Sequence, residues 1–362
     1  MFAVFALAVI ILYVLLISRF IKGWDELQEF EASKMPAQIP VTIITAFKNE
    51  EINLPSLAKS IDNQLYQNFE WILVNDHSTD HSVDLMKEII AHGMFGVKII
   101  DNQGNGKKAA IRTGVYEAKN EFIVSLDADV IPTENWLLDI VAFQEKFPSD
   151  LLICPVKIGN NHTFFQRFQQ FEFASIVASG AGATKKGMPI LCNGANLAFL
   201  KSKWIENEPK LRLKEVSGDD IYLLQAIKKS KGVIRFLKSK NSIVETIASK
   251  NWGTFLNQRA RWAGKFAIYS DLELFLTAII TFLTSVVIIT SVALSPFFDY
   301  YSSLFLLLFL AKLTTDTVFF LKISHFFGLK NTLLNSVFFS FIYPFYIVLT
   351  PFLSLFRNKK KW

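Results

Sequence analysis

Long apolar runs occur at both ends of the chain, and shorter apolar runs lie between them. Neither residues 1–18 nor residues 275–294 contain a charged side chain. An apolar run of about 18 residues or more is typical of a helix that crosses a membrane. Residues 300–322 and 332–356 are also apolar, although charges interrupt the first and two prolines interrupt the second. The pattern predicts an N-terminal anchor and, after a long middle region, two to three C-terminal spans.

Charges in and around these runs predict their orientation. Arg19 and Lys22 follow the first run, whereas a signal peptide has its basic residues before the apolar core. This favours an uncleaved anchor whose C-terminal end is cytoplasmic. Lys312 and Asp316 lie one helical turn apart, and we expect them to pair because a lone charge is costly inside a membrane. If all four runs cross, the basic tail 357–362 lies outside, against the positive-inside tendency, so the number of spans stays open.

Between the apolar ends, short β-branched runs alternate with helical patterns. The runs at 41–47, 70–76, 97–101 and 122–129 read as strands. Strands that alternate with helices predict a mostly parallel, Rossmann-like α/β sheet, in which ligands bind at the carboxyl ends of the strands. The predicted organisation is an anchor at 1–21, a juxtamembrane linker at 22–38, a cytosolic domain at 39–265 and a membrane region at 266–362.

Two acids, Asp127 and Asp129, close the fourth predicted strand. On an extended chain, residues two apart point to the same side. Mg²⁺ and Mn²⁺ take few protein carboxylates and fill their other positions with waters and phosphates. The functional prediction is a metal–diphosphate site at these two acids, and the alternative is an ordinary turn before Pro132.

Two more strand ends carry candidate nucleotide-binding residues. The segment GNGKKAAIRTG, residues 104–114, places glycines before a helix and Lys107 in its first turn. Backbone amides at a helix start attract phosphate, and an anion would offset the unfavourable position of a cation there. Asp76 closes the second strand, where a carboxylate can accept hydrogen bonds from a base or a ribose. The alternatives are a solvated charged turn at Lys107 and a helix-capping turn at Asp76.

A helical pattern near residue 260 carries a cation and an aromatic side chain on one face. Gln258, Arg261 and Trp262 fall at positions i, i+3 and i+4. A guanidinium binds oxyanions, and an indole can stack on a sugar ring or a cation. These residue types suit a sugar or phosphate ligand, and the alternative is a basic helix lying at the membrane surface.

Adjacent acids occur at Asp219 and Asp220, directly before an apolar helical run. Acids at a helix start are favoured by the helix dipole and by capping, which explains one of them more readily than two. Beside a metal–diphosphate site, a further carboxylate can deprotonate an incoming hydroxyl. The pattern alone leaves open which of the two acids would do so.

Composition narrows the class of protein. The chain is 51% hydrophobic, too apolar for an ordinary soluble enzyme of 362 residues. An anionic membrane surface accounts for the net charge of +6, because much of the basic excess flanks the apolar runs. Cys154 and Cys192 lack metal-ligand spacing and fit a reduced cytosolic domain. The expected partner surface is a lipid bilayer and not a nucleic acid.

The motifs, taken in order, resemble the family 2 glycosyltransferases, the inverting GT-A enzymes with membrane helices that include the cellulose, hyaluronan and poly-N-acetylglucosamine synthase-like group. The resemblance covers roughly residues 39–265 and closes with a QxxRW. The segments that carry it are VTIITAFKNE (41–50), VNDHSTD (74–80), GNGKKAAIRTG (104–114), DADVIP (127–132), GDD (218–220) and QRARW (258–262).

The resemblance implies a role for each matching residue. Asp76 would bind the base or ribose, Asp127 and Asp129 would contact the sugar-nucleotide, and Asp129 would bind its Mg²⁺ or Mn²⁺. Asp220, rather than Asp219, would be the general base and would face Asp129. The QxxRW would flank the acceptor and the diphosphate, and the segment CNGANLAF (192–199) would be the acceptor-side strand. The chain departs from the family at Asn75, where an acid is usual, and at His77, where a glycine is usual.

The function implied is a metal-dependent, membrane-bound inverting transfer from a nucleotide-diphosphate sugar, most simply a UDP-sugar, to a hydroxyl of a glycan or a lipid-linked acceptor. Such an enzyme would be a multi-pass protein of the cell membrane, with its catalytic domain in the cytosol, and would serve polysaccharide or glycolipid synthesis. Its membrane part is shorter than is usual for processive synthases, so processive and single transfer both stay open. The alternative function is a catalytically silent subunit that assembles a glycan-synthesis complex.

Overall fold

The protein, described by a computed structural model, divides into two compact units. The structure describes residues 1–32, 38–94, 96–159, 163–211, 218–264 and 271–356, and of Asp219 only the backbone. The helical unit takes its residues from 1–26, 163–190, 248–264 and 271–356, and the sheet unit takes the remaining described residues. The domain boundaries predicted from the sequence were placed by the motifs, whereas these two units are defined by which residues pack together. The helices at 164–185 and 252–263 therefore belong to the same unit as the membrane-like helices, although the sequence placed them in the domain at 39–265.

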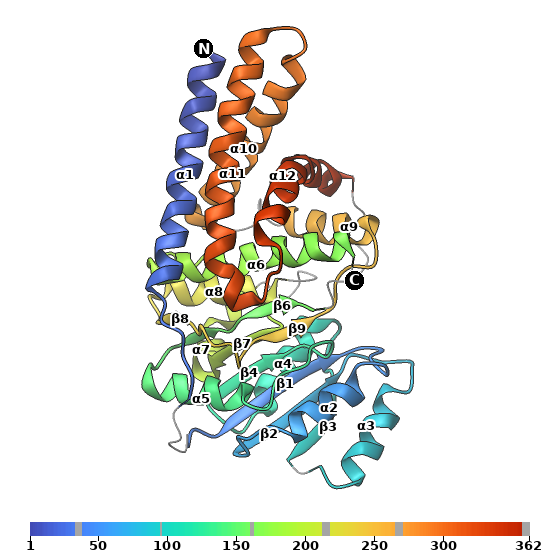
Figure 1. Cartoon of the computed structure of the whole chain (residues 1–362). Coiled ribbons are helices and arrows are strands. Elements are labelled where there is room, and N and C mark those ends of the chain that lie inside the picture. The colour runs from blue at the N-terminus through green and yellow to red at the C-terminus, as the bar shows by residue number, and fades with distance from the viewer. Residues whose placement is uncertain (33–37, 95, 160–162, 212–217, 265–270, 357–362) are drawn as a thin grey trace. The chain divides into compact units, whose positions relative to one another are not determined.

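The sheet unit is built on seven strands in the order β3-β2-β1-β4-β7-β5-β8 (Figure 1). Strand β7 runs antiparallel to both of its neighbours and the other pairs are parallel, which confirms the predicted mostly parallel sheet. A second, two-stranded parallel sheet pairs β6 with β9. The strands are β1 (Val41–Phe47), β2 (Phe69–Asn75), β3 (Val97–Asp101), β4 (Phe122–Leu126), β5 (Leu151–Ile153), β6 (Val156–Ile158), β7 (Asn196–Leu200), β8 (Ile234–Phe236) and β9 (Val244–Thr246).

Continuous apolar sequence explains why β1 and β4 lie at the centre of this sheet. All five residues of β4 and six of the seven in β1 are buried, as expected for strands covered on both faces. The helices of the unit are α2 (Leu54–Asp62), α3 (Ser82–Ala91), α4 (Lys107–Glu117), α5 (Trp136–Lys146), α7 (Lys201–Asn207) and α8 (Asp219–Lys229), with a 3₁₀ turn at Glu208–Lys210.

A glycine fixes how closely α4 approaches the sheet. A Cβ added to Gly114 would lie 2.6 Å from Cγ2 of Ile44, so a larger residue would push the helix away from β1. This close contact places the first turn of α4, with Lys107, at the edge where the strands end. The sequence therefore positions a candidate ligand-binding residue through the packing of a residue two turns away.

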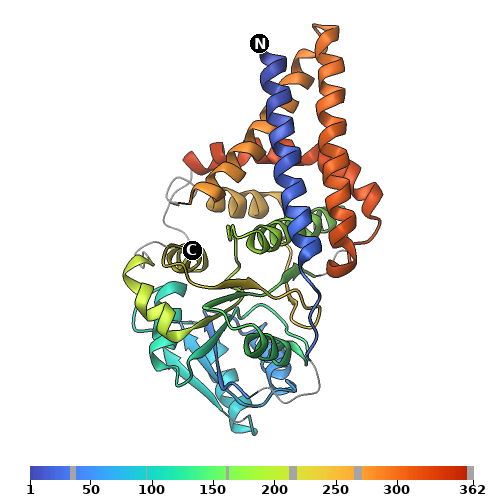
Figure 2. The same ribbon diagram turned by 90° about the vertical axis from the view of Figure 1, so that its left-hand side faces the viewer.

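The helical unit contains α1 (Phe2–Glu26), α6 (Phe164–Lys185), α9 (Trp252–Ala263), α10 (Leu272–Leu294), α11 (Asp299–Phe327) and α12 (Thr332–Leu355). Four of these, α1, α10, α11 and α12, are long and apolar enough to cross a membrane, as the apolar runs predict. Helices α1, α10 and α11 pack along one another (Figures 1 and 2). These helices support an association with a membrane, while the tail at 357–362 lies outside the described residues.

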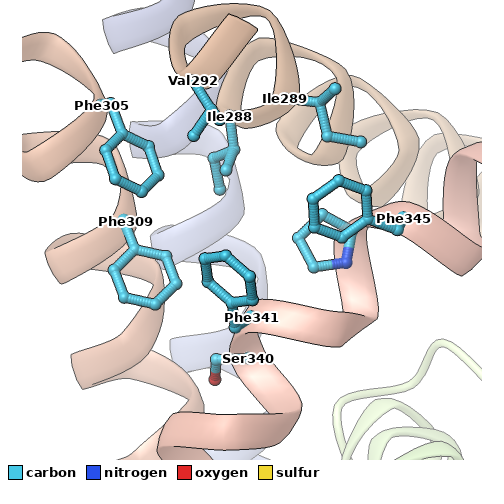
Figure 3. Close-up of a pocket in the computed structure, with 9 residues that line it drawn as sticks. Ile288, Ile289, Val292, Phe305, Phe309, Ser340, Phe341 and Phe345 are labelled. Carbon is cyan, nitrogen blue, oxygen red and sulfur yellow. The ribbon is translucent and has the colours of Figure 1, made fainter. Parts of the chain in front are cut away.

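Inside this unit, the predicted pairing of Lys312 with Asp316 on α11 is confirmed. Asp316 also accepts hydrogen bonds from Tyr13 on α1, at 2.6 Å, and from Ser340 on α12, at 3.2 Å. A charge that contacts three helices is satisfied within the protein and does not face lipid. Helix α12 contains Pro344 and bends in its middle, as expected where a proline removes a backbone hydrogen bond (Figures 1 and 3).

A small pocket lies between α10, α11 and α12 (Figure 3). Ser340 contributes the single polar side chain of its lining, and none of the candidate site residues reaches it. The pocket therefore belongs to the apolar packing of the membrane-like helices. Its other lining residues are Ile288, Ile289, Val292, Phe305, Phe309, Phe341, Pro344 and Phe345.

Candidate active site

The two acids of the DxD lie in a turn and not on an extended strand. Strand β4 ends at Leu126, and Ala128 and Asp129 form a turn, so the prediction of a strand reaching residue 129 is wrong. The physical reason is pairing: the ladder to β7 stops at Leu126, and the backbone N–H of Asp127 then donates to the carbonyl of Ala195 at 3.3 Å. The two carboxylates nevertheless act on each other electrostatically.

Negative charge is concentrated around Asp129. Burial, followed by the nearby carboxylates of Asp127 and Glu50, raises the pKa of Asp129 to about 6, while Lys107 acts in the opposite direction. A carboxylate that resists ionisation because it is buried, with other carboxylates nearby, is stabilised in its charged form by a cation that binds beside it. The turn after β4 is therefore an electrostatically suitable place for a divalent metal ion.

Lys107 connects the glycine-rich loop to the DxD turn. Its Nζ lies 2.5 Å from Oδ1 of Asp127, and both side chains remain about one-quarter exposed. The helix begins here because Gly106 adopts φ = 85°, which favours glycine, and ends the loop. The next residue, Lys108, is buried, and its Nζ lies 4.4 Å from the centre of the Tyr222 ring on α8. Helix α4 thus presents one cation to the turn and buries the other against α8.

Asp76 is tied to the same loop. Its Oδ1 accepts hydrogen bonds from Nδ2 of Asn102, at 2.6 Å, and from the backbone N–H of Gly106, at 2.9 Å. Asp76 is 3% exposed, so these bonds orient its carboxylate strongly. The sequence analysis assigned no role to Asn102. The signal that could have found it is its position directly after β3, at a strand end where ligands bind. The contacts join Asp76, the loop and Lys107 at one sheet edge.

Asp220 lies at the start of α8, whose N-cap Gly218 has a left-handed φ of 91°. Its Oδ2 accepts a hydrogen bond from the backbone N–H of Gly194 at 3.0 Å. The carbonyl of the next residue, Ala195, accepts a hydrogen bond from the backbone N–H of Asp127. Two adjacent residues before β7 therefore contact Asp220 and Asp127. The side chain of Asp219 lies outside the described residues, so the prediction that Asp220 is the one facing Asp129 stays a prediction.

Gln258, Arg261 and Trp262 lie on α9, in the helical unit and not in the sheet unit with the carboxylates. The helix begins with a capping box in which Asn251 and Thr254 exchange hydrogen bonds. Between the predicted residues stands Arg259, which the motif leaves unassigned. The structure therefore brings together the nucleotide-side residues in one unit and, separately, the three QxxRW residues in the other.

Comparison with known proteins shows what the first part of the sheet unit is similar to. Residues 42–207 match the family described as Glycosyl transferase family 2. Over 94 residues the chain is 36% identical to the undecaprenyl-phosphate 4-deoxy-4-formamido-L-arabinose transferase of Aeromonas hydrophila subsp. hydrophila, a segment that covers 25% of this chain and 29% of that one. Over 133 residues it is 33% identical to the teichoic acid poly(glycerol phosphate) polymerase of Staphylococcus epidermidis, covering 36% and 17% of the two chains.

The alignments therefore span less than a third of the length of these two curated relatives. Among solved structures, the mannosyltransferase PcManGT from Pyrobaculum calidifontis, in complex with GDP-Man and Mn²⁺, aligns over 100% of both chains with a TM-score of 0.60 and 15% identity. At that identity the likeness concerns the fold. It agrees with the mostly parallel α/β sheet and the apolar helices found above.

Proposed function

We propose that this chain, a glycosyltransferase with a family 2 domain of the GT-A fold, moves a sugar from a nucleotide-diphosphate donor to a hydroxyl group of a lipid-linked or glycan acceptor at a membrane. The observation that carries the proposal is the contact series Asp76–Gly106 and Lys107–Asp127. It joins the predicted base-binding, phosphate-binding and DxD residues at the carboxyl ends of parallel strands, where such sheets bind ligands.

On the donor side, Asp76 would hold the base or ribose and Lys107 the diphosphate. Lys107 is partly exposed and paired with Asp127, so an incoming phosphate would meet a cation that is already oriented. A UDP-sugar is the donor that we propose. The solved relative in fold holds GDP-Man, which makes GDP-sugars the second donor class to test.

The residues at the DxD turn fit a divalent cation. Burial, together with the neighbouring carboxylates of Asp127 and Glu50, raises the pKa of Asp129 to about 6, and a positive charge bound there would relieve the repulsion among the three acids. We propose Asp129 as the protein ligand, with Asp127 contacting the donor. Bound there, Mg²⁺ or Mn²⁺ would supply neutralising charge to the leaving diphosphate. The solved relative in fold contains Mn²⁺, which supports this choice of metal class.

Asp220 is the proposed general base. It would take the proton from the acceptor hydroxyl as that oxygen attacks C1 of the sugar from the face opposite the diphosphate, so a single displacement inverts the anomeric centre. Gly194 holds its carboxylate through a backbone N–H, which fixes its direction. Gln258, Arg261 and Trp262 would flank the acceptor and the diphosphate, with the Arg261 guanidinium stabilising the developing charge.

The membrane-like helices support the proposed acceptor and location. The relative from Aeromonas hydrophila is named for undecaprenyl phosphate, and that from Staphylococcus epidermidis for a cell-wall polymer. Together with four membrane-like helices, these names support a lipid-linked or polysaccharide acceptor and a multi-pass protein of the cell membrane whose sheet unit is cytosolic. The QxxRW on α9 supports a relation to the cellulose and hyaluronan synthase-like group.

The test is Asp220→Asn in membranes carrying the full chain, assayed with labelled UDP- and GDP-sugars and with product sizing. Asparagine can still accept the Gly194 N–H bond, so the loop is kept while the base is removed. We expect transfer to fall about 10²–10⁴-fold with nucleotide affinity unchanged. Near-normal turnover would overturn the role of Asp220, and a parent protein that neither transfers nor hydrolyses any donor would favour the silent assembly subunit.

A further inference from the structure

A buried ion pair joins α6 to α9 beside the QxxRW residues. Nε of Arg259 donates to Oε1 of Glu172 at 2.7 Å, and Nη2 donates to Oε2, so the guanidinium and carboxylate meet through two parallel bonds. The side chains are 5% and 2% exposed. Bidentate geometry of this kind fixes orientation as well as charge. The pair therefore holds the Arg259 side chain in one direction.

Besides Glu172 and the ring of Phe255, Arg259 contacts two residues of the QxxRW. Its Nη1 donates to Oε1 of Gln258 at 2.6 Å. Its guanidinium carbon lies 4.2 Å from the centre of the Trp262 ring, within the range of a cation–π contact. A hydrogen bond and a stacked cation thus orient the two side chains on either side of Arg259 in the sequence. Glu172, through Arg259, sets both.

Other contacts in the helical unit hold Glu172 and α9 in place. The hydroxyl of Tyr346, on α12, donates to Oε1 of Glu172 at 3.1 Å. One helical turn before Glu172, the amide of Gln169 pairs with both the backbone N–H and the carbonyl of Ser249, just before α9. Helix α6 therefore contacts both the residue preceding α9 and the middle of α9, and α12 adds a hydroxyl group to the second contact.

Stability alone does not require this ion pair. Replacing a buried ion pair by apolar residues of similar volume is often neutral or stabilising, because desolvating two charges offsets their attraction. What apolar residues cannot supply is the hydrogen bond to Gln258 and the cation over Trp262. The contacts therefore favour a role in orientation.

We propose that Glu172 and Arg259 are positioning residues that orient Gln258 and Trp262 for the acceptor, with Tyr346 linking this arrangement to membrane-like helix α12. The proposal rests on the proposed function, in which Gln258 and Trp262 flank the acceptor. Neither Glu172 nor Arg259 is assigned contact with the substrate. A displacement of about 1 Å in groups that orient a substrate can lower the rate about 100-fold.

The test is the double variant Glu172→Leu/Arg259→Met in the full chain. We expect a melting temperature at or above that of the parent in detergent, and a 10–100-fold loss in kcat/KM for the acceptor. The matched control is Lys312→Met/Asp316→Leu, which removes a second buried ion pair of the helical unit, on α11. We expect this control to keep transfer within about threefold of the parent.

A readout without substrate separates this inference from the proposed function. The seven tryptophans can be labelled with 5-fluorotryptophan, and Trp262→Phe identifies the ¹⁹F resonance of Trp262. We expect Glu172→Leu/Arg259→Met to shift or broaden that resonance, whereas Lys312→Met/Asp316→Leu leaves it in place. Because this measurement uses no donor, it stands even if the chain proves inactive with every sugar.

The proposal is overturned if the double variant folds, keeps the parent's Trp262 resonance and transfers at the parent rate. If that variant fails to accumulate, Arg259→Lys decides, because lysine keeps the charge but lacks the planar fork. A folded Arg259→Lys protein with about tenfold lower kcat/KM and a shifted Trp262 resonance supports the proposal. Parent-like values for both overturn it.

Discussion

Two ion pairs, one in each unit, differ in how far solvent reaches their side chains. Lys107 and Asp127, at the carboxyl edge of the sheet, are each about one-quarter exposed, whereas Arg259 and Glu172, in the helical unit, are almost fully buried. A partly exposed cation can exchange a carboxylate for a phosphate, because water already reaches it. A buried bidentate pair cannot, and it acts through the residues it orients.

The difference predicts opposite phenotypes. Breaking the exposed pair should impair ligand binding and leave the fold intact, because partly exposed ion pairs contribute little to stability. Breaking the buried pair on one side should damage the fold, because it leaves an uncompensated charge. Variants in the two units can therefore confirm or contradict the comparison directly.

The largest expected effect is that of Glu172→Leu alone. It leaves the Arg259 guanidinium buried without its carboxylate, which typically destabilises a protein by about 3–5 kcal/mol. We expect a strongly lowered melting temperature in detergent. Adding Arg259→Met to the same chain should restore it. A single variant as stable as the parent would show that water reaches Arg259, and the contrast between the pairs would fail.

Lys107→Met should produce the reverse pattern. Removing this amino group takes away the proposed diphosphate contact, and we expect kcat/KM for the donor to fall roughly 100-fold, as for the loss of a charge-assisted contact. The melting temperature should change little, since the pair is partly exposed. Isothermal titration with the nucleotide diphosphate measures the affinity. An unchanged affinity would remove Lys107 from the donor site.

The sequence predicted the sheet unit well because its signals are local. The continuous apolar runs of β1 and β4 are visible as short patterns, and so are the polar residues at the end of β2 and just after β4. The error at Asp129 came from pairing: where β4 stops depends on β7, about 70 residues later, and no local pattern shows it.

In the helical unit, by contrast, the important contacts join residues that are distant in the sequence, and local patterns did not reveal them. The QxxRW pattern drew attention to Gln258 and Trp262, while Arg259 between them went unassigned. Its partner was detectable in principle, because Glu172 stands within the apolar segment FEFA at 171–174, and an acid there needs a partner. Matching the two requires the contact between α6 and α9, residues about 90 apart in sequence, which only the structure supplies.

A third variant tests the charge concentration at the DxD turn. The pKa of Asp129 is raised to about 6 from an ordinary value of 3.8, so its ionisation opposes folding. This penalty is absent below about pH 4, grows between pH 4 and 6, and is complete above pH 6, where it amounts to roughly 1–3 kcal/mol. Asp129→Asn removes it.

We therefore expect Asp129→Asn to raise the melting temperature of metal-free protein at pH 7.5 and to change it much less at pH 4.5. Added Mn²⁺ should stabilise the parent at pH 7.5 and narrow the difference, since it binds the carboxylate that asparagine lacks. The same variant should lose transfer. A destabilised Asp129→Asn protein at pH 7.5 would contradict the electrostatic account of this turn.

The smallest expected effect concerns Asn102, which orients Asp76 without contacting the proposed donor. Asn102→Ala removes one of the two hydrogen bonds to Oδ1 of Asp76, while the Gly106 N–H remains. We expect a loss of about 1 kcal/mol, or about fivefold in nucleotide affinity, with the melting temperature lowered by only a few degrees. Titrations with the nucleoside and with the nucleoside diphosphate should show the same ratio of variant affinity to parent affinity, because Asp76 would contact the base or ribose and not the phosphates. A loss of affinity confined to the diphosphate would instead mean that Asn102 acts through the loop and Lys107. The Lys107–Asp127 pair would then be oriented by a residue outside the pair, as the Arg259–Glu172 pair is.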